Sequence, residues 1–443
     1  MRPCPYTYRE LLGPVVARAL AAATLPTASH DAAPMHSGMS SRPAPPPPTC
    51  SAADAREAVA RAREAHQTWL AAGAEARGAA ITRLRAEVSL RRHVLEGALG
   101  HSTGLGAADA AEECWDADRV LRHGTGGFGA ALHRWSRLPH RVHVPDRLDV
   151  TPAVTVSYGD DARPLASLFE GALPALLRGG AVVTEVSARS APTALTVSAL
   201  ARDAGLPPGA WQVVVRGEAA DGIRDAGLRA VLAEHADALA SLCCPPGAVG
   251  TDRPRPPCML VLRHDGSARA AARGAVRGCF TRAGRGCAAT PLIVVHASRA
   301  EDFLENFIHR AASFTGTTAL ANERQYIRLT EWTDTAVAAG ARALVPRPRA
   351  AGNRPGGAPP VPDPVILTDP GHLHDVRPDI PLGPVALVLR FTRWAEVLDH
   401  ARHTGRHLSV FTRTRLSQLV PQFAGLPAHR IHLNQPPRPG LLP

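Results

Sequence analysis

The sequence predicts an α/β protein made of two consecutive three-layer α/β/α domains with mostly parallel sheets. Two features of the chain predict it. Short apolar runs bounded by glycine or proline alternate with helical patterns over residues 148–215, and the same alternation returns over residues 259–433. Strands that alternate with helices are joined by crossovers, which make the strands parallel and place helices on both faces of the sheet. A chain of 443 residues with 45% hydrophobic residues is long enough to bury two such cores.

Residues 1–50 are predicted to be a leader that precedes the folded part. The apolar stretch from Leu11 to Leu25 is interrupted by Pro14 and Arg18, and a proline run ends the segment. A disordered extension or a start codon placed too early explains this pattern better than a signal peptide, which needs an unbroken apolar core. No run of about eighteen apolar residues occurs, so we expect no membrane span.

Three helical segments are expected next. Ser51 and Asp54 form a capping-box pattern that starts a helix reaching Leu70. A helix over residues 107–121 is expected to hold Trp115 on its apolar side. Between these two, apolar residues at three- and four-residue steps predict a helical segment through Ile81, Leu84, Val88, Leu90, Val94 and Leu95.

The first α/β unit completes a domain that we place at residues 51–253. Val231–Leu232 predicts a strand and Asp237–Leu242 a helix, while the Pro-, Gly- and Arg-rich residues 244–257 predict an irregular loop. Before them, strands are expected at residues 148–158, 181–187 and 211–215, with helices at 165–177 and 191–204.

The second unit repeats this rhythm, and we place it at residues 254–435 with a truncated tail at 436–443. Residues 346–364 are rich in glycine and proline and predict a loop. The expected strands are Met259–Leu262, Leu292–Val295, Val385–Phe391, Leu408–Thr412 and Ile431–Leu433. The expected helices are Ala268–Phe280, Glu301–Ala312, Arg324–Ala339, Trp394–His403 and Leu416–Phe423.

Composition excludes several classes of function. All 50 basic residues are arginine, but they are spread thinly and only 4% of residues are aromatic, so we expect no nucleic-acid partner. The eight cysteines include no Cys-x-x-Cys pair, and His372 and His374 suit a solvated loop, so no metal site is expected. A chain of this length needs no disulfides, which favours a cytoplasmic location.

Residues 278–290 contain the candidate nucleophile. This stretch holds Cys279 and Cys287, and it leads from a helix through a glycine-containing turn into an apolar strand. Arg282 and Arg285 lie between the two cysteines, and nearby positive charge favours the reactive thiolate. The residues alone leave open a nucleophile or a packed structural thiol.

Three blocks of the chain resemble the aldehyde dehydrogenase superfamily, and the likeness covers residues 51–435. The first block reads PALLRGGAVV from Pro174, followed by AGLPPG from Ala204, and is similar to the family's "PAL-x-x-GNAVV-x-KPS … AGLPPG". The second runs from Ala270 to Cys287 and resembles "F-x-x-x-GQ-x-C". The third begins with PLGPV at Pro381 and resembles "E-x-FGPV … RF … SVFT".

This resemblance implies an aldehyde dehydrogenase-like fold of two Rossmann-like domains and a covalent mechanism on a small-molecule aldehyde. It picks Cys287 as the thiolate that attacks the carbonyl carbon and leaves Cys279 in the core. Asp252 falls near the carboxylate that activates the hydrolytic water. NAD or NADP would accept the hydride. The resemblance also implies a homodimer or homotetramer.

Three residues stand at the positions of the family's cofactor contacts, and only Ser187 keeps the family's residue. Ser187 stands at the serine of "KPS", Glu185 at its lysine, and Leu382 at the phenylalanine of "E-x-FGP". An acid at position 185 would accept hydrogen bonds from ribose hydroxyls, which favours NAD over NADP. Elsewhere the chain departs from the pattern: Ala162 replaces the asparagine that donates to the oxyanion, and Ile380 replaces the glutamate that contacts the nicotinamide ribose.

These departures leave three functions open. The first is a working NAD(P)-dependent aldehyde dehydrogenase. The second is a degenerate member, either a pseudoenzyme kept for binding or a decaying gene. The third is an acyl reductase that uses the same cysteine on activated acids and needs no water-activating carboxylate. Titration with NAD and NADP separates the first two.

Overall fold

The computed structural model describes most of the chain beyond the leader. The described residues are 49–125, 142–143, 152–217, 226–240, 258–286, 288–314, 316, 318–320, 323–344, 361–368, 380–402, 407–423, 426 and 430–436. They form two compact units. The first unit comprises residues 1–103 and 110–242, and the second comprises residues 104–109 and 243–443.

The first unit begins with consecutive helices, and the first of them has a buried face made mostly of alanine. Helix α2 (Ala52–Ala71) starts as predicted, because Ser51 and Asp54 cap it reciprocally: the Asp54 backbone N–H donates to Ser51 Oγ, and Ser51 N–H donates to Asp54 Oδ2. The segment predicted through Leu95 is two helices, α3 (Gly73–Leu90) and α4 (Arg92–Thr103). The break leaves Leu90 exposed and lets Leu95 turn inward.

Helix α5 (Ala107–Thr125) forms as expected, but the placement of Trp115 on its buried side is wrong. Its side chain is 60% exposed, and the guanidinium of Arg92 lies 4.4 Å from the ring centroid in a cation–π contact. The buried stripe of α5 is carried instead by small and aliphatic residues at helical spacing, namely Ala110, Cys114, Ala117, Val120 and Leu121.

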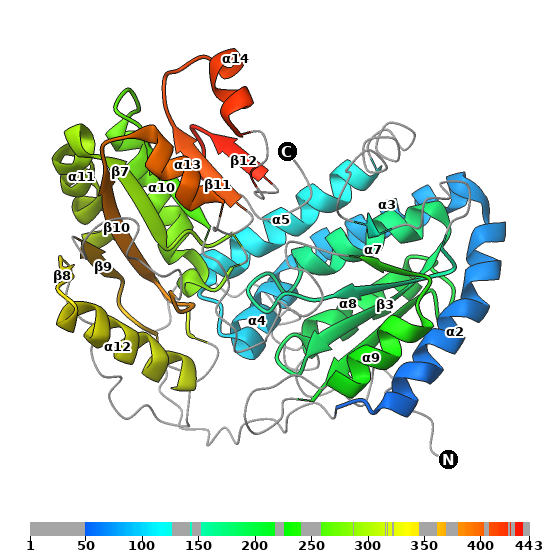
Figure 1. The fold of residues 1–443 in the computed structure, drawn as a ribbon. Coiled ribbons are helices and arrows are strands. Elements are labelled where there is room, and N and C mark those ends of the chain that lie inside the picture. The colour runs from blue at the N-terminus through cyan, green and yellow to red at the C-terminus, as the bar shows by residue number, and fades with distance from the viewer. Residues whose placement is uncertain are drawn as a thin grey trace, which may run out of the picture. The chain divides into compact units, whose positions relative to one another are not determined.

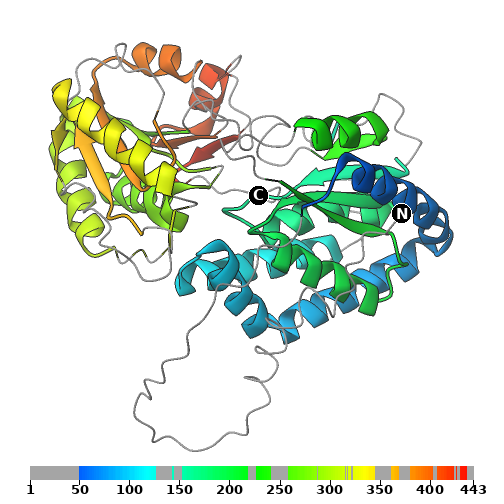
Figure 2. The same ribbon diagram turned by 90° about the horizontal axis from the view of Figure 1, so that it is seen from below.

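The sheet of the first unit has the strand order β1-β5-β2-β3-β4. All its neighbours are parallel except β1 and β5. The strands are β1 (Val142–His143), β2 (Val154–Tyr158), β3 (Ala181–Ser187), β4 (Trp211–Arg216) and β5 (Ala238–Ala240). Helices α2 and α9 (Ala226–His235) pack together over one face, and α7 (Ala166–Arg178) and α8 (Ala191–Asp203) pack on the strands with α3 behind them (Figures 1 and 2).

The predictions of a strand at residues 231–232 and of a helix from residue 237 are wrong in type as far as residue 240, and residues 241–242 lie outside the described residues. Val231 and Leu232 lie in helix α9, where Leu228, Val231 and Leu232 share the face that packs on α2. Residues 238–240 are the strand β5 rather than a helix, because they complete the parallel ladder beside β2. Both segments are too short for their periodicity to separate helix from strand.

The sheet of the second unit has the order β12-β11-β6-β7-β10-β9-β8 and is parallel except for β8 at its edge. From the centre outward the strands are β7 (Leu292–His296), β6 (Met259–Leu262), β10 (Val385–Phe391), β11 (His407–Phe411), β9 (Val365–Thr368), β12 (Arg430–Leu433) and β8 (Arg342–Ala343). Strands β8 and β9 were not predicted, since they are short and flank the Gly/Pro-rich segment.

Helices cover both faces of this second sheet (Figure 1). One face packs on α10 (Ala268–Phe280) and α11 (Ala300–Ala312), and the other on α12 (Glu323–Ala338) and α13 (Trp394–Ala401). The last predicted helix is shorter than expected: α14 covers Leu416–Leu419, and a 3₁₀ turn, Val420–Phe423, continues it. The predicted α/β class with two three-layer units and mostly parallel sheets is confirmed.

Candidate functional site

The structure describes three of the five predicted site residues. Ser187 and Glu185 lie on β3 in the first unit, and Leu382 precedes β10 in the second. Cys287 and Asp252 fall outside the described residues, as do His372 and His374. The candidate residues therefore lie in two separate regions, the carboxyl end of β3 in the first unit and the turn that leads to Cys287 in the second.

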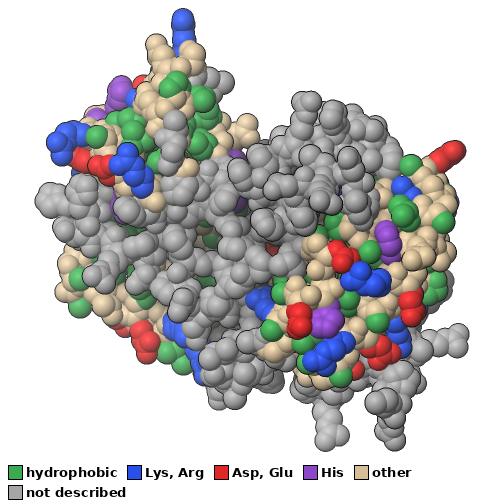
Figure 3. Space-filling view, turned by 45° about the vertical axis from the view of Figure 1, so that its right-hand side comes forward, with side chains coloured by type: hydrophobic (Ala, Val, Ile, Leu, Met, Phe, Trp, Pro, Cys, Tyr) green, Lys and Arg blue, Asp and Glu red, His purple; other side chains and the backbone are tan. Residues whose placement is uncertain are grey.

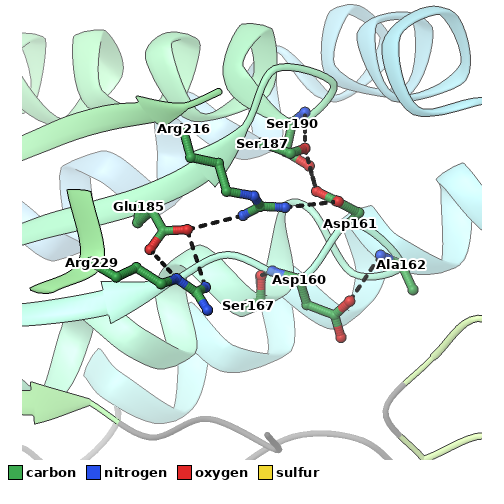
Figure 4. A network of polar contacts seen from close by, with 9 residues as sticks. All are labelled: Asp160, Asp161, Ala162, Ser167, Glu185, Ser187, Ser190, Arg216 and Arg229. Carbon is green, nitrogen blue, oxygen red and sulfur yellow. Dashed lines mark hydrogen bonds and ion pairs between the residues drawn. The ribbon is translucent and has the colours of Figure 1, made fainter. Parts of the chain in front are cut away.

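Glu185 is a fully buried carboxylate that two arginines enclose (Figure 4). Its Oε2 accepts from Arg229 Nε at 2.7 Å, and its Oε1 accepts from Arg229 Nη2 at 3.1 Å and Arg216 Nη1 at 3.2 Å. Arg216 ends β4 and Arg229 comes from α9, so the carboxylate ties three elements together. An isolated buried charge is costly, and these partners are what allow Glu185 to be buried.

Arg216 also reaches a second carboxylate, Asp161, at 3.3 Å. Asp161 follows β2 and accepts from Ser187 Oγ at 2.5 Å and from Ser190 Oγ at 2.7 Å. We call Glu185, Arg216, Arg229 and Asp161 the ion network (Figure 4). It holds two guanidinium groups and two carboxylates, so its formal charges cancel.

Tyr158 closes one side of the ion network. The guanidinium of Arg229 lies 4.8 Å from the centroid of its ring. Burial raises the pKa of the Tyr158 phenol, the charge of Glu185 raises it further, and Arg229 partly opposes them. The phenol is therefore neutral at physiological pH.

The ion network does not fit a dinucleotide in the way that the resemblance implies. Parallel α/β sheets bind nucleotides at the carboxyl ends of their strands, which is where Glu185 and Ser187 lie. Both residues have no exposed surface, and the polar atoms of their side chains are bonded within the cluster. Asp161, whose side chain is 31% exposed, is the network's most accessible member, and sequence reasoning passed over it. The cofactor roles of Glu185 and Ser187 remain predictions.

Hydrogen bonds and a buried ion pair fix the segment that contains Ala162. Ala162 N–H donates to Asp160 Oδ1 at 2.9 Å. Arg163 and Glu170 form a buried bidentate ion pair, with both bonds at 2.8 Å. Glu113 accepts from the backbone N–H groups that start α7. Position 162 is thus rigidly held, and its side chain is a methyl group that cannot donate to an oxyanion.

The turn before Cys287 has an unusual backbone. We call residues 281–286 the Cys turn. Arg282 and Ala283 both have φ of 53°, and Gly284 has φ of 64°. The Arg282 backbone N–H donates to the Asp109 carboxylate at 2.9 Å. Successive left-handed residues are rare outside glycine, so neighbouring groups must hold this conformation.

The Cys turn meets the PLGPV block of the third motif. A Cβ on Gly284 would lie 1.9 Å from the carbonyl oxygen of Gly383, so the two backbones touch. Leu382 is next to this contact, is 41% exposed, and accepts from Gln325 Nε2 through its carbonyl. Two signature blocks that are far apart in sequence are therefore adjacent in the second unit.

Cys279 is a core thiol, as predicted. Its side chain is 1% exposed and donates to the Thr290 carbonyl at 3.0 Å. Burial raises its pKa far above the ordinary value for a thiol. Burial and the charges of Glu96 and Glu113 likewise raise the pKa of Cys114 to about 12. Neither thiol forms a thiolate at neutral pH, so neither competes with Cys287.

Two further properties of the described residues bear on function. No three histidine, cysteine or acidic side chains among them are grouped as metal ligands. No helix in that part of the chain is both long and apolar enough to cross a membrane. On the face drawn in Figure 3, the arginine and acidic side chains that are coloured lie interspersed.

A sequence model described as "Aldehyde dehydrogenase family" matches residues 40–226 and 259–436. The chain belongs to the aldehyde dehydrogenase family. Among curated family members, 3,6-anhydro-alpha-L-galactose dehydrogenase of Streptomyces coelicolor is 28% identical over 61% of this chain and 58% of its own length. N-succinylglutamate 5-semialdehyde dehydrogenase of Paraburkholderia xenovorans is 26% identical over 82% of this chain and 76% of its own length.

Solved structures of the family share the fold. An NAD-dependent benzaldehyde dehydrogenase from Corynebacterium glutamicum has a TM-score of 0.69 at 19% identity, covering 88% of this chain and 86% of its own. An NADP-dependent glyceraldehyde-3-phosphate dehydrogenase from Bacillus halodurans, complexed with NADP, has a TM-score of 0.67 at 18% identity. The match covers 88% of this chain and 84% of the dehydrogenase chain. At these identities the likeness establishes the fold alone.

Proposed function

We propose that this chain oxidises a small aldehyde to the carboxylic acid, with NAD⁺ or NADP⁺ as the hydride acceptor and Cys287 as the nucleophile. The observation that carries the proposal is the Cys turn, a strained backbone held by Asp109 and packed on Gly383 immediately before Cys287. Backbone strain of this kind gathers at functional sites. Family membership supplies the reaction class.

The chain's own residues have defined roles in this proposal. The Cys287 thiolate forms a bond to the carbonyl carbon, and the carbonyl oxygen becomes an oxyanion. Because position 162 is alanine, backbone N–H groups have to stabilise that oxyanion without a side-chain amide. After oxidation to the thioester, Asp252 takes a proton from water, the water oxygen bonds to the acyl carbon, and the thiolate leaves. When bound, NAD(P)⁺ supplies the hydride acceptor.

The cofactor is proposed from the family rather than from the ion network. Relatives named as NAD-dependent and as NADP-dependent both share the fold. Glu185 would exclude a 2′-phosphate by its charge, which favours NAD, provided that a nucleotide reaches it. We further propose a cytoplasmic location. We also propose a homodimer or homotetramer, and sedimentation of the purified chain would determine which of the two forms.

The test is turnover with a matched pair of cysteine variants. Purified wild type, Cys287→Ser and Cys50→Ser are incubated with a panel of aldehydes, including semialdehydes, and with NAD⁺ or NADP⁺. Reduced nicotinamide is followed by its absorbance. We expect turnover by wild type and Cys50→Ser and none by Cys287→Ser. Absence of turnover by wild type, together with no binding of either nucleotide in calorimetry, contradicts the proposal.

A second candidate function is favoured by the ion network. A neutral, closed cluster where the adenosine ribose is expected suits a family member that retains the fold and a reactive cysteine without oxidising aldehydes. In that case an aldehyde still forms a reversible thiohemiacetal with Cys287 and protects the thiol from iodoacetamide, and mass spectrometry measures the fraction of Cys287 that is labelled. Nucleotide titration separates it from the first candidate.

A further inference from the structure

We propose that Asp109 is a positioning residue for the nucleophile, because its carboxylate sets the conformation of the Cys turn. The proposal rests on the proposed role of Cys287. Asp109 lies in the first turn of α5, 173 residues away from the backbone group that it binds. No motif in the sequence draws attention to it.

The Cys turn needs an external support. Arg282 and Ala283 are non-glycine residues in the left-handed region, and their side chains disfavour it. The helix that precedes them ends at Phe280, so the N–H groups of these two residues lie beyond α10, in the 3₁₀ turn Thr281–Gly284. The Asp109 carboxylate accepts from the first of these groups, Arg282 N–H, at 2.9 Å.

The Asp109 carboxylate is itself held. The hydroxyl of Thr318 donates to Asp109 Oδ2, the same oxygen that accepts from Arg282. Thr318 Oγ1 in turn accepts from Gly106 N–H at 2.9 Å, and Ala319 N–H donates to the Gly104 carbonyl at 2.9 Å. The support therefore runs from the start of α5, through a buried threonine, to the backbone of the turn.

The far side of the Cys turn is also fixed. Gly284 packs on the Gly383 carbonyl, and Ala289 N–H donates to the Gly286 carbonyl at 2.9 Å. Thr290 N–H donates to the Gly278 carbonyl at 3.0 Å. The Cys turn is therefore held at Gly284 and Gly286 on its far side, and at Arg282 by the Asp109 carboxylate.

The experiment compares four variants of the full chain. Asp109→Asn keeps the size of the side chain but removes its charge, and Thr318→Val removes the hydroxyl that orients it. Thr318→Ser keeps that hydroxyl, and Asp116→Asn removes a carboxylate of the same helix that pairs with Arg119. Amide hydrogen exchange of the peptide over residues 281–286 measures how readily the backbone of the Cys turn opens. Alkylation of Cys287 by iodoacetamide, across the pH range in which a thiol titrates, reports its positioning.

We expect Asp109→Asn and Thr318→Val to speed exchange of this peptide and to slow Cys287 alkylation by about tenfold each, the effect of losing one charge-assisted hydrogen bond. Thr318→Ser and Asp116→Asn are expected to match wild type in both. The Thr318 pair keeps the test decisive if Asp109→Asn folds poorly.

Unchanged exchange in Asp109→Asn and Thr318→Val overturns the proposal. Faster exchange with unchanged alkylation also overturns it, because the turn would then not position the thiol. Failure of the proposed function has a different signature: wild-type Cys287 would alkylate no faster than Cys50, and the positioning role would fall with it.

Discussion

Glu185 shows how one residue changes the character of a site. By resemblance the family has a lysine at this position, and the chain has the opposite charge. The carboxylate is buried because Arg216 and Arg229 bind both of its oxygens. Removing the carboxylate would leave two guanidinium groups facing each other in a desolvated place.

We predict that Glu185→Ala lowers the free energy of unfolding by about 3–5 kcal/mol, the usual cost of breaking a buried ion pair from one side. Urea unfolding followed by circular dichroism measures it. Asp399→Asn is the matched control, because its pair with Arg402 is exposed on both sides. That change should cost less than about 1 kcal/mol. Equal losses in the two variants would show that the ion network contributes no more than a surface pair.

Asp265 makes stability depend on pH. Burial raises the pKa of this carboxyl, but hydrogen bonds from Thr414, Thr412 and the Arg413 backbone, with the charge of Arg263, outweigh burial and hold the pKa below its ordinary value. The unfolded chain therefore binds the proton first as pH falls. The stabilisation is complete above the unfolded pKa of about 4 and disappears as pH falls through the lower folded value.

We predict that Asp265→Asn lowers stability at neutral pH and flattens the acid limb of the stability profile. The measurement is the free energy of unfolding in urea at several pH values down to the acid range. In the wild type the charged carboxylate accepts from both threonine hydroxyls, and protonation at low pH removes this charge. The stabilities of wild type and Asp265→Asn should therefore converge at the lowest pH. A constant difference between wild type and variant at every pH would contradict this.

At the scale of elements, the Cys turn contains one glycine, Gly284, with both a left-handed backbone and a close backbone contact. Gly284 has φ of 64°, and a Cβ there would lie 1.9 Å from the carbonyl oxygen of Gly383. Alanine would therefore be strained both by its backbone and by the clash, and either the turn or the segment before β10 would have to move.

We predict that Gly284→Ala costs at least about 2 kcal/mol of unfolding free energy and slows alkylation of Cys287. Gly286→Ala is the control two residues away, since a Cβ there has open space and its φ is not positive. It should change stability by less than about 1 kcal/mol. Chemical denaturation and timed iodoacetamide labelling provide the two measurements. If Gly284→Ala and Gly286→Ala changed stability and labelling to a similar extent, the close contact between Gly284 and Gly383 would not explain the effect.

At the scale of the whole molecule, the chain has two compact units with separate cores. Multidomain chains commonly unfold in more than one step. We predict that calorimetry resolves two transitions, with Glu185→Ala lowering one and Gly284→Ala lowering the other. The two substitutions lie in different units, so each acts on its own core. A single transition that both variants lower equally would show instead that the units unfold together.

The sequence by itself determined the architecture. The alternation of apolar runs and helical periods predicted parallel α/β units because both signals are local and long enough to read. It failed at residues 231–240, where the segments were short, and at Trp115, where a large apolar residue lies beside a stripe of smaller ones. The motifs also separated Cys287 from Cys279, which is buried as expected.

Only the tertiary structure showed which side chains form hydrogen bonds and ion pairs with each other. Glu185 pairs with Arg216 and Arg229, which are 31 and 44 residues away in the sequence. The sequence around Glu185 therefore could not predict that its carboxylate is enclosed by arginines. Asp109 and Arg282 are 173 residues apart and belong to no common motif. Local periodicity and turn chemistry fix elements, whereas a buried charge or a strained turn is stable only through partners that the folded chain brings from a distance.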